Sequence, residues 1–199
     1  MTRFRVLLEI GLILTAVVCA GAQQRSPADG PPYAGFDRND YPGDAALPGL
    51  RAHFAFTGYW LTNPPLENQN TWLGKRDILR RNGFGFAVLA NGKLDSEIKK
   101  AQHAGVAPKK LGEQDGSAAA RAARREGFPR GTILFLDQEE GGRLYAEQAD
   151  YLLAWTDAVA HTEYRPGVYA SGQPVNDGKD AAGRPVTITT IQDIRQRVA

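Results

Sequence analysis

The chain has 199 residues, of which 42% are hydrophobic and 23% charged. These are the values of a globular protein long enough for one domain with a sizeable core, and they exclude wholesale disorder. The formal net charge is +2, which gives no support for a nucleic-acid-binding protein with its concentrated basic face. No stretch reaches the roughly 18 apolar residues of a membrane span, so no stable membrane insertion is expected once a signal segment is removed.

Residues 1–22 have the organisation of a secretory signal peptide. Two arginines lie within the first five residues, residues 6–18 form an apolar run interrupted by Glu9, and Ala20-Gly21-Ala22 fits the small-residue cleavage pattern. We therefore expect a mature chain that starts at Gln23 and is released to the periplasm or the medium.

The only cysteine, Cys19, lies inside the signal segment. Lipidation at this residue is the less favoured interpretation, because a lipoprotein signal has a small residue where this chain has Val18. After cleavage the chain has no cysteine, which excludes disulfides, thiolate catalysis and cysteine-based zinc sites.

Short apolar segments alternate with longer amphipathic ones along the rest of the chain. Residues 23–32 are rich in Pro, Gly and Ala and are expected to form a flexible leader. Five strands are predicted, at residues 33–37, 53–60, 84–90, 132–137 and 166–170. Helical segments are predicted at residues 45–51, from Thr71 to a stop at Asn82-Gly83, and at 118–126, 144–159 and 187–198. Residues 93–112 are ambiguous between a short helix and a loop, and residues 172–183 are predicted to be a polar loop.

The strand–helix alternation predicts an α/β fold whose parallel strands are joined by right-handed crossovers. Two architectures fit, an open doubly wound sheet and a (β/α) TIM-barrel-like fold. No Gly-rich phosphate loop follows the first strand, and polar and aromatic residues collect at the carboxyl ends of the strands, which favours the barrel. A closed barrel of this type has eight strands. The predicted TIM-barrel-like fold, with about five βα units, is therefore incomplete, and its open edges favour self-association.

The most informative motif is Asp137-Gln138-Glu139-Glu140, at the end of the apolar fourth strand. Residues two apart in an extended chain point to the same side, so Asp137 and Glu139 are expected to enter one cavity. Of two neighbouring carboxyl groups, one can hold a proton near neutral pH. A carboxylic acid beside an ionised carboxylate is the pair that cleaves glycosidic bonds. Asp37, at the end of the first strand, is a candidate third acid.

Competing interpretations of these acids remain at this point. Asp137 can be read as the cap of the following helix, and Glu139 and Glu140 as solvated surface residues. A divalent metal site is not favoured, because the three histidines have no ligand spacing, and no cofactor is expected.

Substrate-binding candidates are the polar and aromatic residues at the strand ends. Tyr59 and Trp60 are adjacent on an extended segment, so only one of them can face the cavity, and strand aromatics more often belong to a core. The full set of these candidates is Tyr59, Trp60, Asn91, Gln138, Glu140 and Tyr169.

Several segments resemble bacterial glycoside-hydrolase-like TIM-barrel domains, which are similar in turn to the Chalaropsis-type muramidases. The resemblance extends from about Tyr33 to the C-terminus, and the block LDQEEGG, residues 136–142, is its most specific part. The other segments that carry it are YAGFDRNDYP (33–42), FTGYWL (56–61), NTW (70–72) and GFGF (83–86). The resemblance implies that Asp37 and Asp137 stabilise the glycosyl cation or activate the nucleophile, and that Glu139 donates the proton. Because these relatives continue past the last helix, the resemblance implies that the domain at residues 33–199 is C-terminally short.

The sequence therefore predicts an exported glycoside-hydrolase-like protein that acts on or binds cell-wall or related polysaccharide, such as peptidoglycan glycan. Whether it is an enzyme stays open. The second interpretation is a non-catalytic carbohydrate-binding or envelope-interaction protein that keeps an acidic pocket. A third is a signal-bearing fragment of a longer gene product that does not fold stably.

Overall fold

The computed structural model describes residues 33–198. The predicted signal peptide (1–22) and leader (23–32) lie outside the described residues. None of the described helices is long and apolar enough to cross a membrane.

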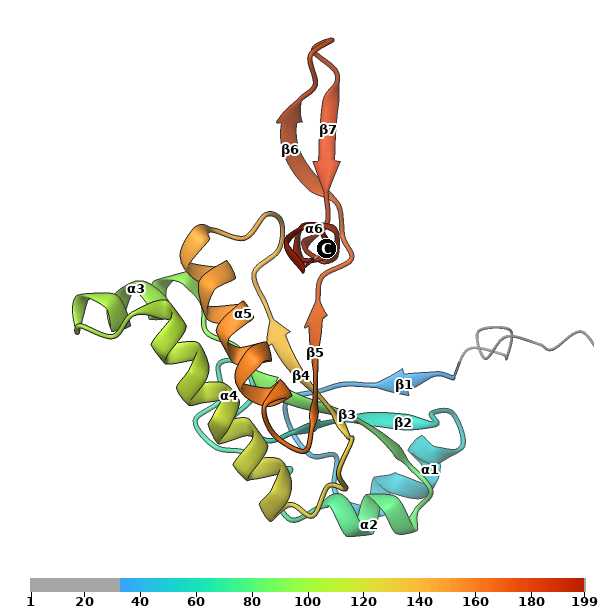
Figure 1. Ribbon diagram of the computed structural model, residues 1–199. Coiled ribbons are helices and arrows are strands. Elements are labelled where there is room, and N and C mark those ends of the chain that lie inside the picture. The colour runs from blue at the N-terminus through green and yellow to red at the C-terminus, as the bar shows by residue number, and fades with distance from the viewer. Residues whose placement is uncertain (1–32, 199) are drawn as a thin grey trace, which may run out of the picture. The chain divides into compact units, whose positions relative to one another are not determined.

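Five parallel strands form one sheet in the order β1-β2-β3-β4-β5 (Figure 1). They are β1 (Gly35–Phe36), β2 (Phe56–Trp60), β3 (Gly85–Asn91), β4 (Ile133–Gln138) and β5 (Arg165–Ala170). Helices alternate with these strands, which confirms the predicted α/β class and the predicted number of parallel strands. Among the described residues, β1 and β5 each pair with a single neighbour and form the two edges of the sheet.

The connections between strands are helical. A 3-10 helix η2 (Asp44–Ala46) and α1 (Leu47–Arg51) join β1 to β2, and α2 (Arg76–Arg81) joins β2 to β3. Helices α3 (Asp95–His103) and α4 (Pro108–Arg125) precede β4, and α5 (Ala146–Ala160) precedes β5. Helices α3, α4 and α5 pack together beside the sheet (Figure 1). The ambiguous stretch 93–112 thus contains α3 and the start of α4, which begins ten residues before the predicted alanine-rich helix.

The predicted polar loop at residues 172–183 is wrong. An antiparallel hairpin occupies this region, formed by β6 (Val175–Lys179) and β7 (Pro185–Ile188), and it projects away from the five-stranded sheet (Figure 1). Most of its residues are exposed, so no apolar alternation marks it in the sequence. The last helix, α6 (Thr190–Val198), therefore starts three residues later than predicted.

The two faces of the sheet have different roles. Leu134 and Leu136 of β4 are fully buried, with Val88 of β3, in the core beside α4 and α5. Strand alternation turns Phe135 and Asp137 to the opposite face, where the Phe135 ring lies over Gly167 of β5. The helix-covered face is thus the hydrophobic core, and the opposite face carries the candidate site.

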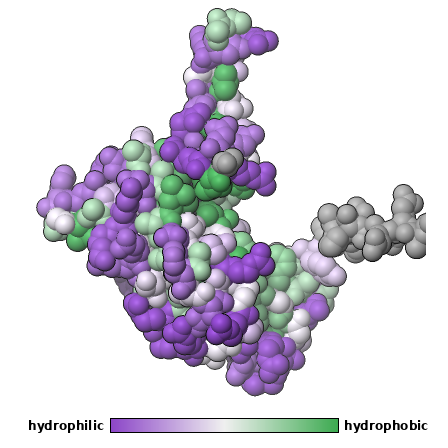
Figure 2. Space-filling model, viewed as in Figure 1, coloured by the Kyte–Doolittle hydropathy of each residue, from purple (hydrophilic) through white to green (hydrophobic). Residues whose placement is uncertain are grey.

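The edge strand β1 exposes apolar surface. Figure 2 shows hydrophobic residues, in green, over this strand, and Tyr33 just before it is 78% exposed. An uncovered edge of this kind favours pairing with another chain, so self-association through the sheet edges stays a prediction.

Two glycines let α4 approach the backbone of α5. A Cβ atom added at Gly116 would lie 2.6 Å from the Trp155 carbonyl oxygen, and one at Gly112 would overlap the Tyr151 carbonyl oxygen. We expect Gly116→Ala to lower the free energy of unfolding by about 1–3 kcal/mol, because the helices must separate. Urea unfolding measures this effect. The control is Gly49→Ala in α1, where an added Cβ meets nothing within 4 Å and stability should hold or rise. Equal stability of the two variants would contradict the packing argument.

Candidate active site

Three carboxyl groups meet at the carboxyl ends of β1 and β4. Asp37 follows β1, Asp137 is the second-to-last residue of β4, and Glu139 comes directly after that strand. The register aligns Asn91 of β3 with Asp137, and Asp137 with Tyr169 of β5. Because paired residues of parallel strands point to the same face, these side chains lie in one row.

Asp37 is directed over β2 by a glycine. Its carboxyl group rests on Gly58, where an added Cβ would overlap the carboxylate oxygen and come within 2.9 Å of Cγ. The indole N–H of Trp60 donates to the Arg38 carbonyl at 3.2 Å and lies near the Asp37 carboxyl group, whose pKa it lowers. Trp60 is therefore the member of the Tyr59–Trp60 pair that faces the acids. This agrees with the expectation that only one of these adjacent residues can do so.

Asp137 is the carboxyl group best placed to keep a proton. Its side chain is buried, and this burial, a hydrogen bond with Glu139 and the negative charges of Glu139 and Asp37 raise its pKa to about 8. Glu139 itself is exposed. Asp137 therefore keeps a proton near neutral pH, and this buried carboxyl group lies beside the solvent-exposed carboxyl group of Glu139.

The negative charges of these acids act on groups on both sides of the sheet. Burial raises the pKa of Tyr169, and the negative charges of Asp37, Asp137 and Glu139 raise it further. Burial likewise raises the pKa of Asp37, against hydrogen bonds from Arg38 and Trp60 that lower it. Asp37 follows the edge strand β1 and Tyr169 lies in the opposite edge strand β5, so their interaction requires a sheet curved enough to bring its two edges toward one site.

Tyr59 lies elsewhere. It is fully buried in the core against Phe86 and Phe128, and its hydroxyl group donates to Glu126 at the end of α4. In this structure Tyr59 reaches neither Asp37, Asp137 and Glu139 nor solvent.

Glu140 anchors the chain after β4. Its carboxylate accepts the backbone N–H of Asp95, the first residue of α3, at 2.8 Å, and the side-chain amide of Gln148 in α5. Gln138 is buried and directs its amide toward the Glu140 carbonyl oxygen at 3.5 Å. Both expected substrate-binding residues thus contact protein groups and fix the segment that bears Glu139.

The helix-capping interpretation of Asp137 does not fit the structure. Helix α5 begins at Ala146, eight residues beyond the end of β4, and Gln148 accepts the backbone N–H of Tyr145 at its start. Among residues 33–198, no group of three or more histidine, cysteine or acidic side chains has the arrangement of a metal site.

Sequence reasoning did not single out Gly58 or Gly92. A Cβ at Gly92 would overlap the Asp137 carbonyl oxygen, which accepts the Gly92 backbone N–H at 3.0 Å. For Gly58 the sequence does contain a signal, because an isolated glycine inside an aromatic strand often marks a position where another group approaches the backbone closely.

The fold and these acids define a glycoside hydrolase-like α/β domain. Residues 59–196 match the family described as "Rv2525c-like, glycoside hydrolase-like domain", and the chain belongs to this family. No curated protein matches.

Among solved structures, the chain is similar to an uncharacterized protein of B. stearothermophilus, with 22% sequence identity and a TM-score of 0.54. The match covers 81% of this chain and 67% of that one. This likeness supports the fold alone.

Proposed function

We propose that this protein acts outside the cytoplasm on bacterial cell-wall or related polysaccharide and cleaves its glycosidic bonds by carboxylate acid/base chemistry. The observation that carries the proposal is the buried carboxyl group of Asp137, with its pKa raised to about 8, beside the exposed carboxyl group of Glu139, with Asp37 close enough for its charge to act on Asp137. Glycosidic cleavage needs this combination of one protonated and one ionised carboxyl group. The family match and the sequence pattern of residues 1–22 support the substrate class and the location.

Each acid has a distinct role in this mechanism. Glu139, at the solvent side of the pair, donates the shared proton to the oxygen of the leaving sugar. Asp137 keeps that proton available near neutral pH through its raised pKa. Asp37 stabilises the positive charge that develops at the anomeric carbon. Water attacks this carbon as the leaving sugar departs, and its proton returns to the acid pair. Tyr169, which is 48% exposed beside the acids, offers its ring to the apolar face of a sugar.

The test is an assay of the full chain on purified peptidoglycan glycan strands and on N-acetylglucosamine oligosaccharides. We expect release of reducing ends from at least one of these substrates, because the proton donor is present at neutral pH. Binding is measured in parallel by calorimetry, and Tyr169→Ala is expected to weaken it. Binding without cleavage would favour a non-catalytic carbohydrate-binding protein, and absence of both would contradict the carbohydrate proposal.

A further inference from the structure

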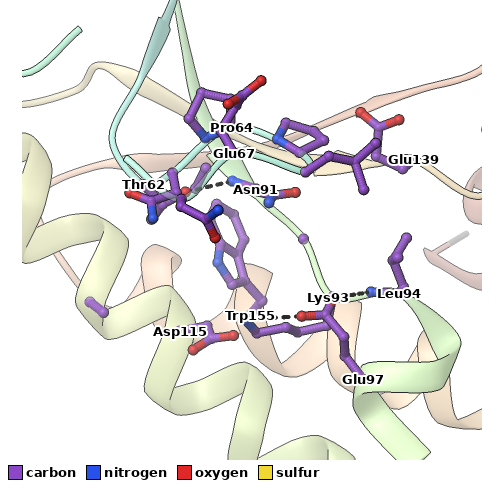
Figure 3. A pocket seen from close by; sticks show the side chains of 17 residues that line it. Thr62, Pro64, Glu67, Asn91, Lys93, Leu94, Glu97, Asp115, Glu139 and Trp155 are labelled. Atoms are coloured by element: carbon purple, nitrogen blue, oxygen red, sulfur yellow. Dashed lines mark hydrogen bonds and ion pairs between the residues drawn. The ribbon is translucent and has the colours of Figure 1, made fainter. Parts of the chain in front are cut away.

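A cavity of about 750 Å³ lies next to Glu139, on the helix side of the acids. Its walls are the segment that follows β2 (62–68) and the residues between β3 and α3, and its floor includes Asp115 of α4 and Trp155 of α5 (Figure 3). Its volume is within the range of small-molecule sites. Glu139 therefore contributes both to the acid pair and to the wall of this cavity.

The charges in the cavity are strongly unequal. Four carboxylate residues and a single cationic one line it: Glu67, Glu97, Asp115, Glu139 and Lys93. The lone cation is partly neutralised, because Lys93 Nζ lies 3.8 Å from the Glu97 carboxylate. Asp115 accepts a hydrogen bond from the Tyr151 hydroxyl at 3.0 Å, which leaves its negative charge in place. A concave site lined by one sign of charge concentrates ligands of the opposite sign.

The remaining lining is apolar. Leu66, which is 94% exposed, and the half-buried Leu94 offer apolar surface, whereas Pro64 and Trp155 are buried behind the lining (Figure 3). Such surfaces pack against the C–H faces of sugar rings, whereas the carboxylates disfavour phosphate, sulfate and uronate groups. The ligand that satisfies both features is a sugar with a positively charged group.

We propose that this cavity binds an amine-bearing hexosamine, a glucosamine unit without its N-acetyl group, as part of the glycan that reaches Glu139. The inference rests on the proposed function, because it assigns a class of sugar to the cavity beside the same acids. The ammonium group of this sugar faces Asp115 and Glu67, and its ring packs on the accessible side chains of Leu66 and Leu94. N-acetylation removes the positive charge and so removes the preference.

The test compares glucosamine and N-acetylglucosamine oligosaccharides of equal length by calorimetry. Binding is measured on Glu139→Gln, which keeps the shape of the cavity and prevents turnover. We expect glucosamine oligosaccharides to bind at least about tenfold more tightly, and the difference to shrink at about 1 M salt, where charges are screened within ~3 Å. Adding Asp115→Asn should reduce the preference about tenfold, and Glu67→Gln should reduce it in the same direction.

Matched controls separate charge from folding. Asn at position 115 can still accept the Tyr151 hydroxyl hydrogen bond, so the variant should keep its thermal stability. Asp157→Asn removes the same charge from an exposed position of α5 outside the cavity and should leave the preference unchanged. Equal affinity for the two oligosaccharides, or a preference that Asp115→Asn and Glu67→Gln both retain, would overturn the inference.

The outcome also separates this inference from the proposed function. Wild-type cleavage of N-acetylated glycan without any preference for the amine-bearing sugar would overturn the inference and leave hydrolysis standing. Preference for the amine-bearing sugar without cleavage of any glycan would support the inference and count against hydrolysis.

Discussion

Glu139→Gln is expected to lower hydrolysis by about 100-fold to 10,000-fold at every pH, the usual contribution of a general acid. Asp137→Asn should behave differently, because it removes the partner of the shared proton and keeps the donor. Wild-type activity is expected to hold below the pKa of about 8 and to fall as the pH rises through it, since the pair then loses its proton. In Asp137→Asn this alkaline limb should move toward the ordinary range of a glutamic acid. Activity should then fall roughly 10- to 100-fold at pH 7 and much less at pH 5.

The measurement is a pH–rate profile of kcat/KM for the wild type and the two variants. An Asp137→Asn profile that loses the same factor at every pH would contradict the shared-proton mechanism.

The stability of the same variants provides the control. The pKa of Asp137 is raised above its ordinary 3.8 by folding, so the stability from proton binding is complete below about 4 and is lost as the pH rises through about 8. Asp137→Asn cannot ionise. Between pH 4 and pH 8 the wild type should therefore lose stability relative to this variant, by on the order of 1–3 kcal/mol in the free energy of unfolding. A helix-capping Asp137 would instead make the variant less stable by about 1 kcal/mol at neutral pH.

The sequence predicted those parts of the fold that depend on local patterns. The apolar run at residues 132–137 was recognisable as a strand, and β4 occupies residues 133–138. Asp137 lies in this strand and Glu139 comes directly after it, and alternation predicts that the two side chains point to the same side. The hairpin at residues 175–188 could not be found in this way, because exposed strands have no apolar period.

The electrostatics of the site depend on contacts between distant segments. The family resemblance implies that Glu139 donates the proton, and it does not indicate that burial raises the pKa of Asp137, which neighbouring strands cover on both sides. Similarly, alternation required Tyr59 and Trp60 to point in opposite directions, yet only the packing of α4 decides that Tyr59 enters the core. The cavity near Glu139 combines residues from five parts of the chain, and no local sequence pattern predicts that they come together.

The second large effect is expected at Gly58, which touches no substrate. Gly58→Ala places a methyl group on the Asp37 carboxylate and within 3.2 Å of Leu89, so Asp37 must leave its position beside Trp60. We expect kcat to fall by at least about 100-fold, because a displacement of about 1 Å at a reacting group has this cost. The control is Gly85→Ala on the neighbouring strand, where the added Cβ meets Phe56 at an ordinary 3.4 Å and activity should be nearly unchanged.

A double-mutant cycle establishes whether Gly58 acts through Asp37. Asp37→Ala alone should lower kcat by about as much as Gly58→Ala, since both remove the same carboxylate from its place. In Asp37→Ala/Gly58→Ala the two methyl groups replace the overlapping carboxylate, so kcat should fall no further and part of any lost thermal stability should return. Losses in kcat that multiply in the double variant would mean that Gly58 supports the site by another route. Full activity in Gly58→Ala would mean that the position of Asp37 over β2 is unimportant to the reaction.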